Sequence, residues 1–230
     1  MDDVMTNQGQ NLITEHQLNG LVSDMLKDYV RFRPHMESMV RDYLRMKPYF
    51  EWLEAGRPDP PHPMIKHMII KEYRYKFHHT IAPCIFIETG TFKGDTIEAV
   101  KNDFYKIYSI ELGQNLFEYA SNRFANYDHI SILQGNSSEI LPKIIKDIER
   151  PCLFWLDAHH SGGITAKAEN NPPIMAEVAC ILNHPVKNHV ILMDDARGLD
   201  LPSLRNLVLC KRPDLLFKVE DDIVRVYKDY

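Results

Sequence analysis

Short apolar runs alternate with amphipathic stretches through residues 81–230, and this alternation limits the possible folds more than any other feature. Five runs are apolar along most of their length, which is typical of strands buried on both faces of a sheet. Each is followed by a stretch long enough for a helix, so the pattern predicts an α/β domain with a parallel, helix-covered sheet. The runs are CIFIE (84–88), KIYSIE (106–111), ISIL (130–133), CLFWLD (152–157) and VILMD (190–194), with helices expected near 95–103, 115–125, 138–149, 173–183 and 202–210.

The end of the chain follows a different pattern. LFKVE (216–220) and DIVRVYK (222–228) are two apolar-rich runs joined by an acidic turn. Two strands separated by so short a connection pair as an antiparallel hairpin. We therefore expect the parallel sheet to end in an antiparallel strand pair.

The first 80 residues have helical periodicity instead. Apolar residues recur at steps of three and four over residues 18–32, and a second helix is expected to start near Pro34. GRPDPPHP (56–63) breaks helical structure, and a third helix is expected from Met64 to about His78. The sequence thus predicts a helical N-terminal extension over 1–80, serving as a cap, a lid or a dimer contact, and an α/β domain over 81–230.

Composition narrows the functional classes. The net charge of −5 does not indicate a polyanion-binding protein, and no apolar run approaches the roughly 18–20 residues of a bilayer span. The acidic, polar N-terminus does not resemble a secretory signal, and the four cysteines form no C-x-x-C pair, so we expect a cytoplasmic protein. KEYRYKFHH (71–79) mixes bases with aromatics, which fits an amphipathic helix or, alternatively, an RNA contact.

Acidic residues close four of the five predicted parallel strands. These residues are Glu88, Glu111, Asp157 and Asp194, and Asp195 follows the last of them. The carboxyl ends of the strands form the ligand crevice of an open α/β sheet. Because an unpaired carboxylate is costly to bury, four acids at these ends indicate a shared ligand.

The loop after the first strand, within FIETGTFKGDT (86–96), points to the kind of ligand. Gly90 allows a tight turn against a ligand, Gly94 allows close approach to the next helix, and that helix directs its amide dipole at the site. Glu111 comes 21 residues after Gly90, where nucleotide-binding folds hold a ribose diol. The loop lacks the G-x-G-x-x-G that seats a pyrophosphate and carries bulky Phe92 instead, which favours a phosphate-free ligand with a cationic amino-acid end.

Residues 81–230 resemble the class I S-adenosylmethionine-dependent methyltransferases. The resemblance rests on the order and spacing of five stretches, IETGTFKGDT, IYSIEL, ISILQGNSSEIL, CLFWLDAHH and VILMDDAR. The resemblance implies a Rossmann-like seven-stranded sheet with the last strand antiparallel. It places Glu88 and Gly90 along the methionine and ribose of the cofactor, Glu111 on the ribose hydroxyls, and Asn136 and Ser137 beside the adenine. The implied cofactor-binding residues are Glu88, Gly90, Thr91, Gly94, Thr96, Glu111, Leu112, Asn136, Ser137 and Asp157.

The acids after the fourth and fifth strands suggest a metal. Asp157, Asp194 and Asp195 would repel one another unless a cation joins them, and hard oxygen ligands favour Mg²⁺ or Ca²⁺. The pattern resembles metal-dependent O-methyltransferases of the catechol and macrocin type, in which the matching acids bind a divalent ion. That resemblance places His160 in the position of the general base, beside Asp157. Arg197 is an alternative counter-ion, Asp195 an alternative helix cap, and His159 an alternative base or a structural residue.

The sequence as a whole predicts an S-adenosylmethionine-dependent O-methyltransferase that acts, with Mg²⁺, on a hydroxyl of a small molecule. The resemblance suggests a sugar, a glycan precursor or another natural product as acceptor, and a homodimer is possible. A metal-free small-molecule methyltransferase, an RNA methyltransferase and a non-catalytic nucleotide-binding protein of the same fold are the alternatives.

Overall fold

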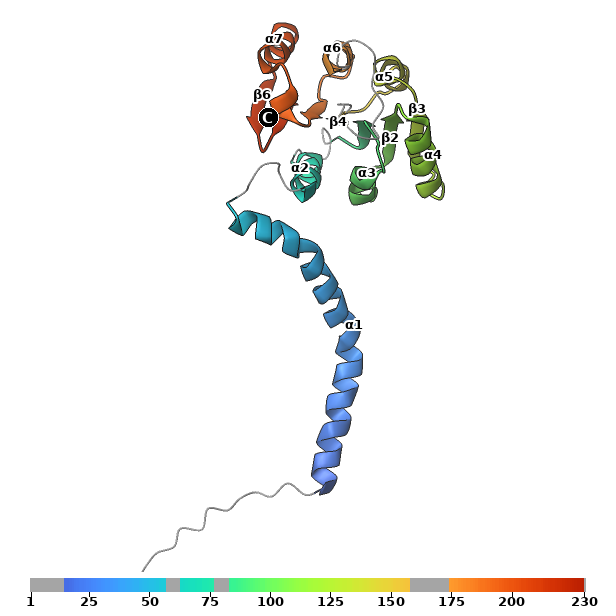
Figure 1. Ribbon diagram of the computed structural model, residues 1–230, viewed down its shortest axis with the longest axis vertical. Coiled ribbons are helices and arrows are strands. Elements are labelled where there is room, and N and C mark those ends of the chain that lie inside the picture. Colours follow the sequence, from blue (N-terminus) through green and yellow to red (C-terminus); the bar gives the residue numbers. More distant parts are fainter. Residues whose placement is uncertain (1–14, 57–62, 77–82, 158–173, 230) are drawn as a thin grey trace, which may run out of the picture. The chain divides into compact units, whose positions relative to one another are not determined.

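The structure is a computed structural model that describes residues 15–56, 63–76, 83–157 and 174–229. Two compact units divide the chain, Met1–Arg57 and Pro58–Tyr230. Figure 1 shows the first as a helix and the second as a sheet flanked by helices. No described helix is both long enough and apolar enough to cross a membrane.

Seven strands form one sheet in the order β3-β2-β1-β4-β5-β7-β6. The first five are parallel, while β7 runs antiparallel to both β5 and β6. This confirms the predicted parallel sheet with an antiparallel last strand. The strands are β1 (Ile85–Thr89), β2 (Lys106–Glu111), β3 (Ile130–Gln134), β4 (Cys152–Leu156), β5 (Val190–Met193), β6 (Leu216–Glu220) and β7 (Ile223–Tyr227).

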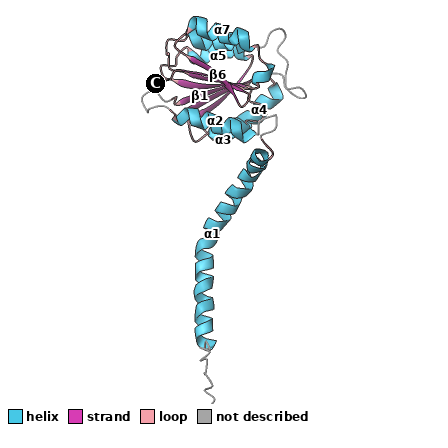
Figure 2. Ribbon diagram, turned by 90° about the vertical axis from the view of Figure 1, so that its left-hand side faces the viewer, coloured by secondary structure: helices cyan, strands magenta, loops and turns pink. Residues whose placement is uncertain are grey.

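Helices cover both faces of the sheet, as Figure 2 shows with α2 and α3 on one face and α5 and α7 on the other. This cover explains why the central strands are continuously apolar: every residue of β4 is buried, whichever face it points to. The helices of this unit are α2 (Pro63–Tyr75), α3 (Asp95–Val100), α4 (Gln114–Arg123), α5 (Ser137–Ile145), α6 (Ile174–Asn183) and α7 (Leu201–Lys211), with the 3₁₀ turn η1 (Ala196–Gly198) after β5.

Helix α2 belongs to the sheet-containing unit, because the two compact units divide between Arg57 and Pro58 and not at residue 80. The helix packs against α3 and β4. Its buried face recurs at steps of three and four residues and consists of Ile65, Ile69, Ile70 and Tyr73. Burial of this face, which the strand pattern alone does not reveal, makes α2 part of the α/β core.

The N-terminal helix α1 (Glu15–Glu54) is one helix of 40 residues, with Pro34 and Pro48 inside it. The expected new helix at Pro34 is therefore wrong. An interior proline removes one hydrogen bond and bends the helix, but it does not end a helix whose flanking segments are both helical. Figure 1 shows α1 as a continuous, curved helix.

Candidate active site

Backbone hydrogen bonds hold the ends of four neighbouring strands at one level. The amide of Gly90 donates to the carbonyl of Ile110 over 2.9 Å, that of Asp157 to Thr89 over 3.0 Å, and that of Asp194 to Leu156 over 3.0 Å. Gly90, Asp157 and Asp194 thus each stand one residue past the paired ends of their strands. Glu111 is level with them, since Ile110 pairs with Thr89.

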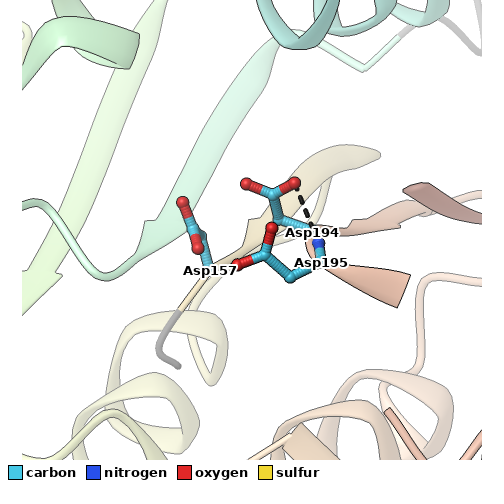
Figure 3. Close-up of side chains that lie close together, drawn as sticks. All are labelled: Asp157, Asp194 and Asp195. Carbon is cyan, nitrogen blue, oxygen red and sulfur yellow. Dashed lines mark hydrogen bonds between the residues drawn. The ribbon is translucent and has the colours of Figure 1, made fainter. Parts of the chain in front are cut away.

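The carboxylates of Asp157, Asp194 and Asp195 form a cluster, which we call the aspartate triad. One oxygen from each lies within 4.8 Å of the others. Figure 3 shows the three side chains gathered at the ends of β4 and β5, with the amide of Asp195 donating to Oδ1 of Asp194 over 2.9 Å. The sequence prediction that these acids converge is confirmed geometrically.

Lys66 from α2 supplies positive charge to the triad. Its Nζ donates to Oδ2 of Asp194 and lies 3.9 Å from Oδ1 of Asp195. Burial lowers the pKa of the ammonium, but the charge of Asp194 and the hydrogen bond it accepts outweigh this, so the net pKa lies above the usual value. Arg197, the sequence candidate for this role, instead pairs with Asp222 over 2.8 Å.

Asp157 and Asp194 hold their protons more tightly than free aspartates do. Burial raises the pKa of Asp157 well above its usual range, and the charge of Asp194 adds to that rise. Burial likewise raises the pKa of Asp194, whose side chain is 1% exposed, while Lys66 opposes the rise. Lys66 therefore offsets only part of the cost of bringing these carboxylates together, and a further cation would be stabilised here.

Asp195 adopts a left-handed backbone conformation with φ 51° and ψ 50°. This conformation is uncommon outside glycine, although aspartate tolerates it better than most residues. Asp195 precedes η1, but its side chain makes no capping hydrogen bond. Its carboxylate is accordingly turned toward the triad instead of serving as the helix cap considered from the sequence.

The donor set of the triad fits a divalent cation. Three carboxylates are hard oxygen ligands, which suit Mg²⁺ and Ca²⁺. Two ligands of one Mg²⁺ stand at most about 4.2 Å apart, and two ligands of Ca²⁺ at most about 5 Å. The three carboxylate oxygens lie within 4.8 Å of one another, which is within the separation that two ligands of Ca²⁺ allow. To bind Mg²⁺, the side chains would have to move slightly closer together.

Glu111 anchors the loop that follows β1. Its Oε2 accepts from the amide of Phe92 and its Oε1 from the amide of Gly113, each over 2.8 Å. Gly90 has φ 86°, which a residue with a side chain adopts only under strain. Each carboxylate oxygen keeps one lone pair free, so Glu111 can still accept from a diol. Its role in ribose binding stays a prediction.

Glu88 is buried and belongs to a hydrogen-bonded chain beneath the loop. The hydroxyl of Ser109 donates to Oε2 of Glu88 over 2.5 Å and lies 2.6 Å from the hydroxyl of Thr91. Burial raises the pKa of Glu88 to about 8, although hydrogen bonds from Ser109 and Thr96 oppose the rise. Glu88 is therefore mainly a neutral acid at pH 7, and its predicted contact with the cofactor stays a prediction.

Gly94 is required for packing. It has φ 80°, and a Cβ placed on it would lie 2.5 Å from Cε2 of Phe124, at the end of α4. This bears out the close approach expected at the start of α3. Direct contact between Gly94 and the cofactor stays a prediction.

The residues predicted beside the adenine stand at the start of α5. Asn136 caps this helix, since its Oδ1 accepts from the amide of Ser138 over 3.1 Å, and Ser137 is buried. Leu112 is half-buried at the end of β2. These positions lie at the same edge of the sheet as Glu111, and their cofactor contacts stay predictions.

Sequence reasoning missed Lys66 and Glu177. Lys66 lies three and four residues before buried Ile69 and Ile70, a spacing that could have placed it beside the core. Glu177 is 1% exposed on α6, and neither of its oxygens has a hydrogen-bond partner among the described residues. Burial raises its pKa to about 7. No local motif marks either residue.

His160 and His159 lie outside the described residues, so the predicted general base stays a prediction. The described part of KEYRYKFHH is engaged within the protein. Lys71 pairs with Asp103 over 3.2 Å, and Tyr75 donates to the same carboxylate over 2.8 Å. Lys76 lies 4.3 Å from the ring of Tyr227. These contacts favour the amphipathic helix over an RNA surface.

Comparison with known proteins identifies the fold. A Staphylococcus aureus protein assigned as a caffeoyl-CoA O-methyltransferase superimposes with a TM-score of 0.51 at 14% identity, covering 84% of this chain and 98% of its own. Precorrin-6y C5,15-methyltransferase from Geobacter metallireducens gives 0.51 at 8% identity, covering 74% and 92%. The chain has the class I methyltransferase fold. The Podospora anserina methyltransferase PaMTH1 with bound S-adenosylhomocysteine gives 0.49 at 16% identity, covering 85% and 96%.

Among the comparisons with known proteins, only the comparison of structures finds the methyltransferase fold. No protein-family model and no curated protein sequence matches the chain. At identities of 14% and 8%, the two superpositions with the higher TM-score show the fold and leave the activity open. The chemistry must therefore be argued from the aspartate triad, the loop after β1 and their surroundings.

Proposed function

We propose that the protein is an S-adenosylmethionine-dependent O-methyltransferase whose aspartate triad binds a divalent cation, with Mg²⁺ the expected ion. The acceptor is a hydroxyl of a small molecule such as a sugar, a glycan precursor or another natural product. The observation that carries the proposal is the level alignment of Gly90, Glu111, Asp157 and Asp194 at the carboxyl edge of a methyltransferase sheet. This edge is where open α/β sheets bind ligands.

The cofactor would lie along the ends of β1 and β2. Glu111 would accept hydrogen bonds from the ribose hydroxyls, while Gly90 allows the backbone to approach the ligand closely. Glu88, Thr91 and Ser109 would support the loop from below through their hydrogen bonds. S-adenosylmethionine supplies an activated methyl group, so the protein must mainly orient the acceptor and remove its proton.

The acceptor would lie next to the triad, at the ends of β4 and β5. A divalent cation held by the triad would lower the pKa of the acceptor hydroxyl. His160 would take the released proton, as the sequence resemblance suggests. Lys66 would hold the charge of Asp194 while no cation is bound and would move aside when one binds, because its ammonium occupies one of the donor oxygens.

Calorimetric titration of the full chain with S-adenosylhomocysteine tests the cofactor part. Glu111→Gln is expected to weaken binding about 10- to 100-fold, because hydrogen bonds to a charged group contribute about 1.5–3 kcal/mol. Glu118→Gln, an exposed residue of α4, is the matched control and should leave affinity unchanged. If the wild-type chain does not bind the cofactor, the non-catalytic alternative replaces this proposal.

Methyl transfer from labelled S-adenosylmethionine to a panel of hydroxylated small molecules tests the reaction and the metal. Activity should disappear with EDTA, return with Mg²⁺ and be lost in Asp194→Asn. Asp214→Asn, an exposed carboxylate paired with Arg212, should retain it. Full activity in EDTA would establish the metal-free alternative. Methyl transfer confined to RNA would establish the RNA methyltransferase.

A further inference from the structure

Helix α1 carries an unbroken heptad pattern over most of its length. Large apolar residues recur at alternating steps of four and three residues from Leu18 to Leu53. A repeat of 3.5 residues sustained over five heptads is the signature of a coiled-coil seam. With Val22 as an a position and Leu18 as a d position, the seam consists of Leu18, Val22, Met25, Tyr29, Phe32, Met36, Met39, Tyr43, Met46, Phe50 and Leu53.

The seam is exposed along the described helix. Eight of its side chains are between 44% and 71% exposed, namely Val22, Met25, Tyr29, Phe32, Met36, Met39, Tyr43 and Phe50. At roughly 90 Å² each, these side chains offer about 700 Å² per chain, close to the ~800 Å² per partner of a standard stable interface. So continuous an apolar stripe marks an interaction surface.

The chain's own α/β unit is too small to cover this seam. From Leu18 to Leu53 the helix extends for roughly 50 Å at 1.5 Å per residue. A compact unit of roughly 170 residues has a diameter of about 40 Å. The occupant must therefore be long and must match the 3.5-residue repeat, as a second copy of α1 does.

Charges beside the seam select a parallel arrangement. In a parallel pair, each g residue faces the e residue five positions later in the partner helix. The sequence places Asp28 and Asp42 at g, and Arg33 and Lys47 at the matching e positions. In a parallel pair, both g-to-e contacts join an aspartate to a basic residue. In an antiparallel pair, g residues face g residues, so Asp28 of one helix would lie opposite Asp42 of the other.

The helix-bending residues lie away from the seam. Pro34 and Pro48 are 14 residues apart, so both fall at the f position, directly opposite a and d. A proline ring clashes with the preceding turn, so the helix bends away from the face that carries the proline. Each bend thus curves α1 toward the seam and leaves the a and d residues free to pack.

A membrane surface fits α1 less well. Seven acidic and six basic residues give the helix a net charge near zero. Helices that lie on anionic membranes concentrate Lys and Arg on the polar face. The balanced charge and the strict heptad spacing both favour a protein partner.

From these observations we infer that the chain forms a homodimer through a parallel, two-stranded coiled coil of α1 over residues 18–53. In this arrangement the two α/β units emerge from the same end of the coiled coil, after Glu54. The inference does not depend on the proposed methyltransferase activity.

Sedimentation equilibrium of the full chain at micromolar concentration tests the dimer. The expected mass is twice 26.8 kDa. The double variant Met25→Glu with Met36→Glu places charges within the seam, since Met25 is a d position and Met36 an a position. This variant should be a monomer. The matched control, Lys27→Glu with Arg41→Glu, changes two f positions and should remain a dimer. Thermal unfolding of the α/β unit should be the same in all three proteins, which shows that each is folded.

Oxidative cross-linking tests the orientation. In a background with exposed Cys210 replaced by serine, Met25→Cys should form an intersubunit disulfide, because like d positions meet in a parallel pair. Lys27→Cys, two residues away at an f position, should not.

Several outcomes would overturn the inference. A wild-type monomer, a trimer or a dimer that survives the seam charges rules out the two-stranded coiled coil. A dimer without the Met25→Cys cross-link rules out the parallel orientation. A different result would assign α1 to a membrane surface: a monomeric wild type that sediments with phosphatidylserine vesicles, and a Met25→Glu, Met36→Glu variant that does not.

Discussion

Replacing Lys66 by methionine removes the positive charge at the aspartate triad and keeps most of the side-chain volume. Asp194 then stays buried, 1% exposed, with no described counter-ion. Removing one partner of a buried ion pair typically costs about 3–5 kcal/mol. Because Lys66 is itself 28% exposed, water screens part of the interaction, and we expect a loss of about 2–3 kcal/mol in EDTA.

Magnesium should restore the stability of the Lys66→Met protein. A ligand at 100 times its dissociation constant stabilises the folded state by about 2.7 kcal/mol, which matches the expected loss. The variant should also bind Mg²⁺ more tightly than the wild type, since no ammonium has to leave Asp194. Lys71→Met is the matched control on the same helix. Its pair with Asp103 is closer to solvent than the Lys66–Asp194 pair, with side chains 42% and 16% exposed, and should contribute less than about 1 kcal/mol.

Urea unfolding followed by far-ultraviolet circular dichroism, with EDTA or with Mg²⁺, measures these free energies. The decisive quantity is the difference in Mg²⁺ stabilisation between Lys66→Met and the wild type. If Mg²⁺ stabilises both proteins equally, or if Lys66→Met loses no more stability than Lys71→Met, the reasoning that Lys66 and a divalent cation share the triad is wrong.

Two further predictions concern the loop after β1. Burial raises the folded pKa of Glu88 to about 8, above its unfolded value of 4.5, so its contribution to stability is complete below pH 4.5 and is lost as pH rises to 8. Glu88→Gln should therefore flatten the fall in unfolding free energy across this range by about 4–5 kcal/mol, and exposed Glu149→Gln should not; parallel curves for all three proteins would contradict this. Gly94→Ala should cost about 2–3 kcal/mol in urea unfolding, because the new methyl group meets Phe124 at a positive φ. Gly198→Ala, which meets nothing within 4 Å, should cost less than about 1 kcal/mol, and equal losses would show that the contact relaxes freely.

The sheet could be predicted from the sequence because its signals are local. Continuous apolar runs, the helical stretches between them and the acidic turn at residues 220–222 each depend on a few neighbouring residues. The acids at the strand ends followed directly, since parallel strands bring their carboxyl ends to one edge. Asp157 and Asp194 therefore converge as the strand order alone requires.

Other features depended on contacts between distant segments. Lys66 contacts Asp194, which lies 128 residues later in the sequence. Phe124, at the end of another helix, leaves no space for a side chain at Gly94. Residues 63–75 read as part of a separate helical extension until the burial of Ile69 and Ile70 placed them in the core. A one-dimensional pattern records which face of a helix is apolar but not which surface it meets. The alternation of strands and helices was thus decided by the sequence alone, whereas tertiary packing decided which cation faces the aspartate triad.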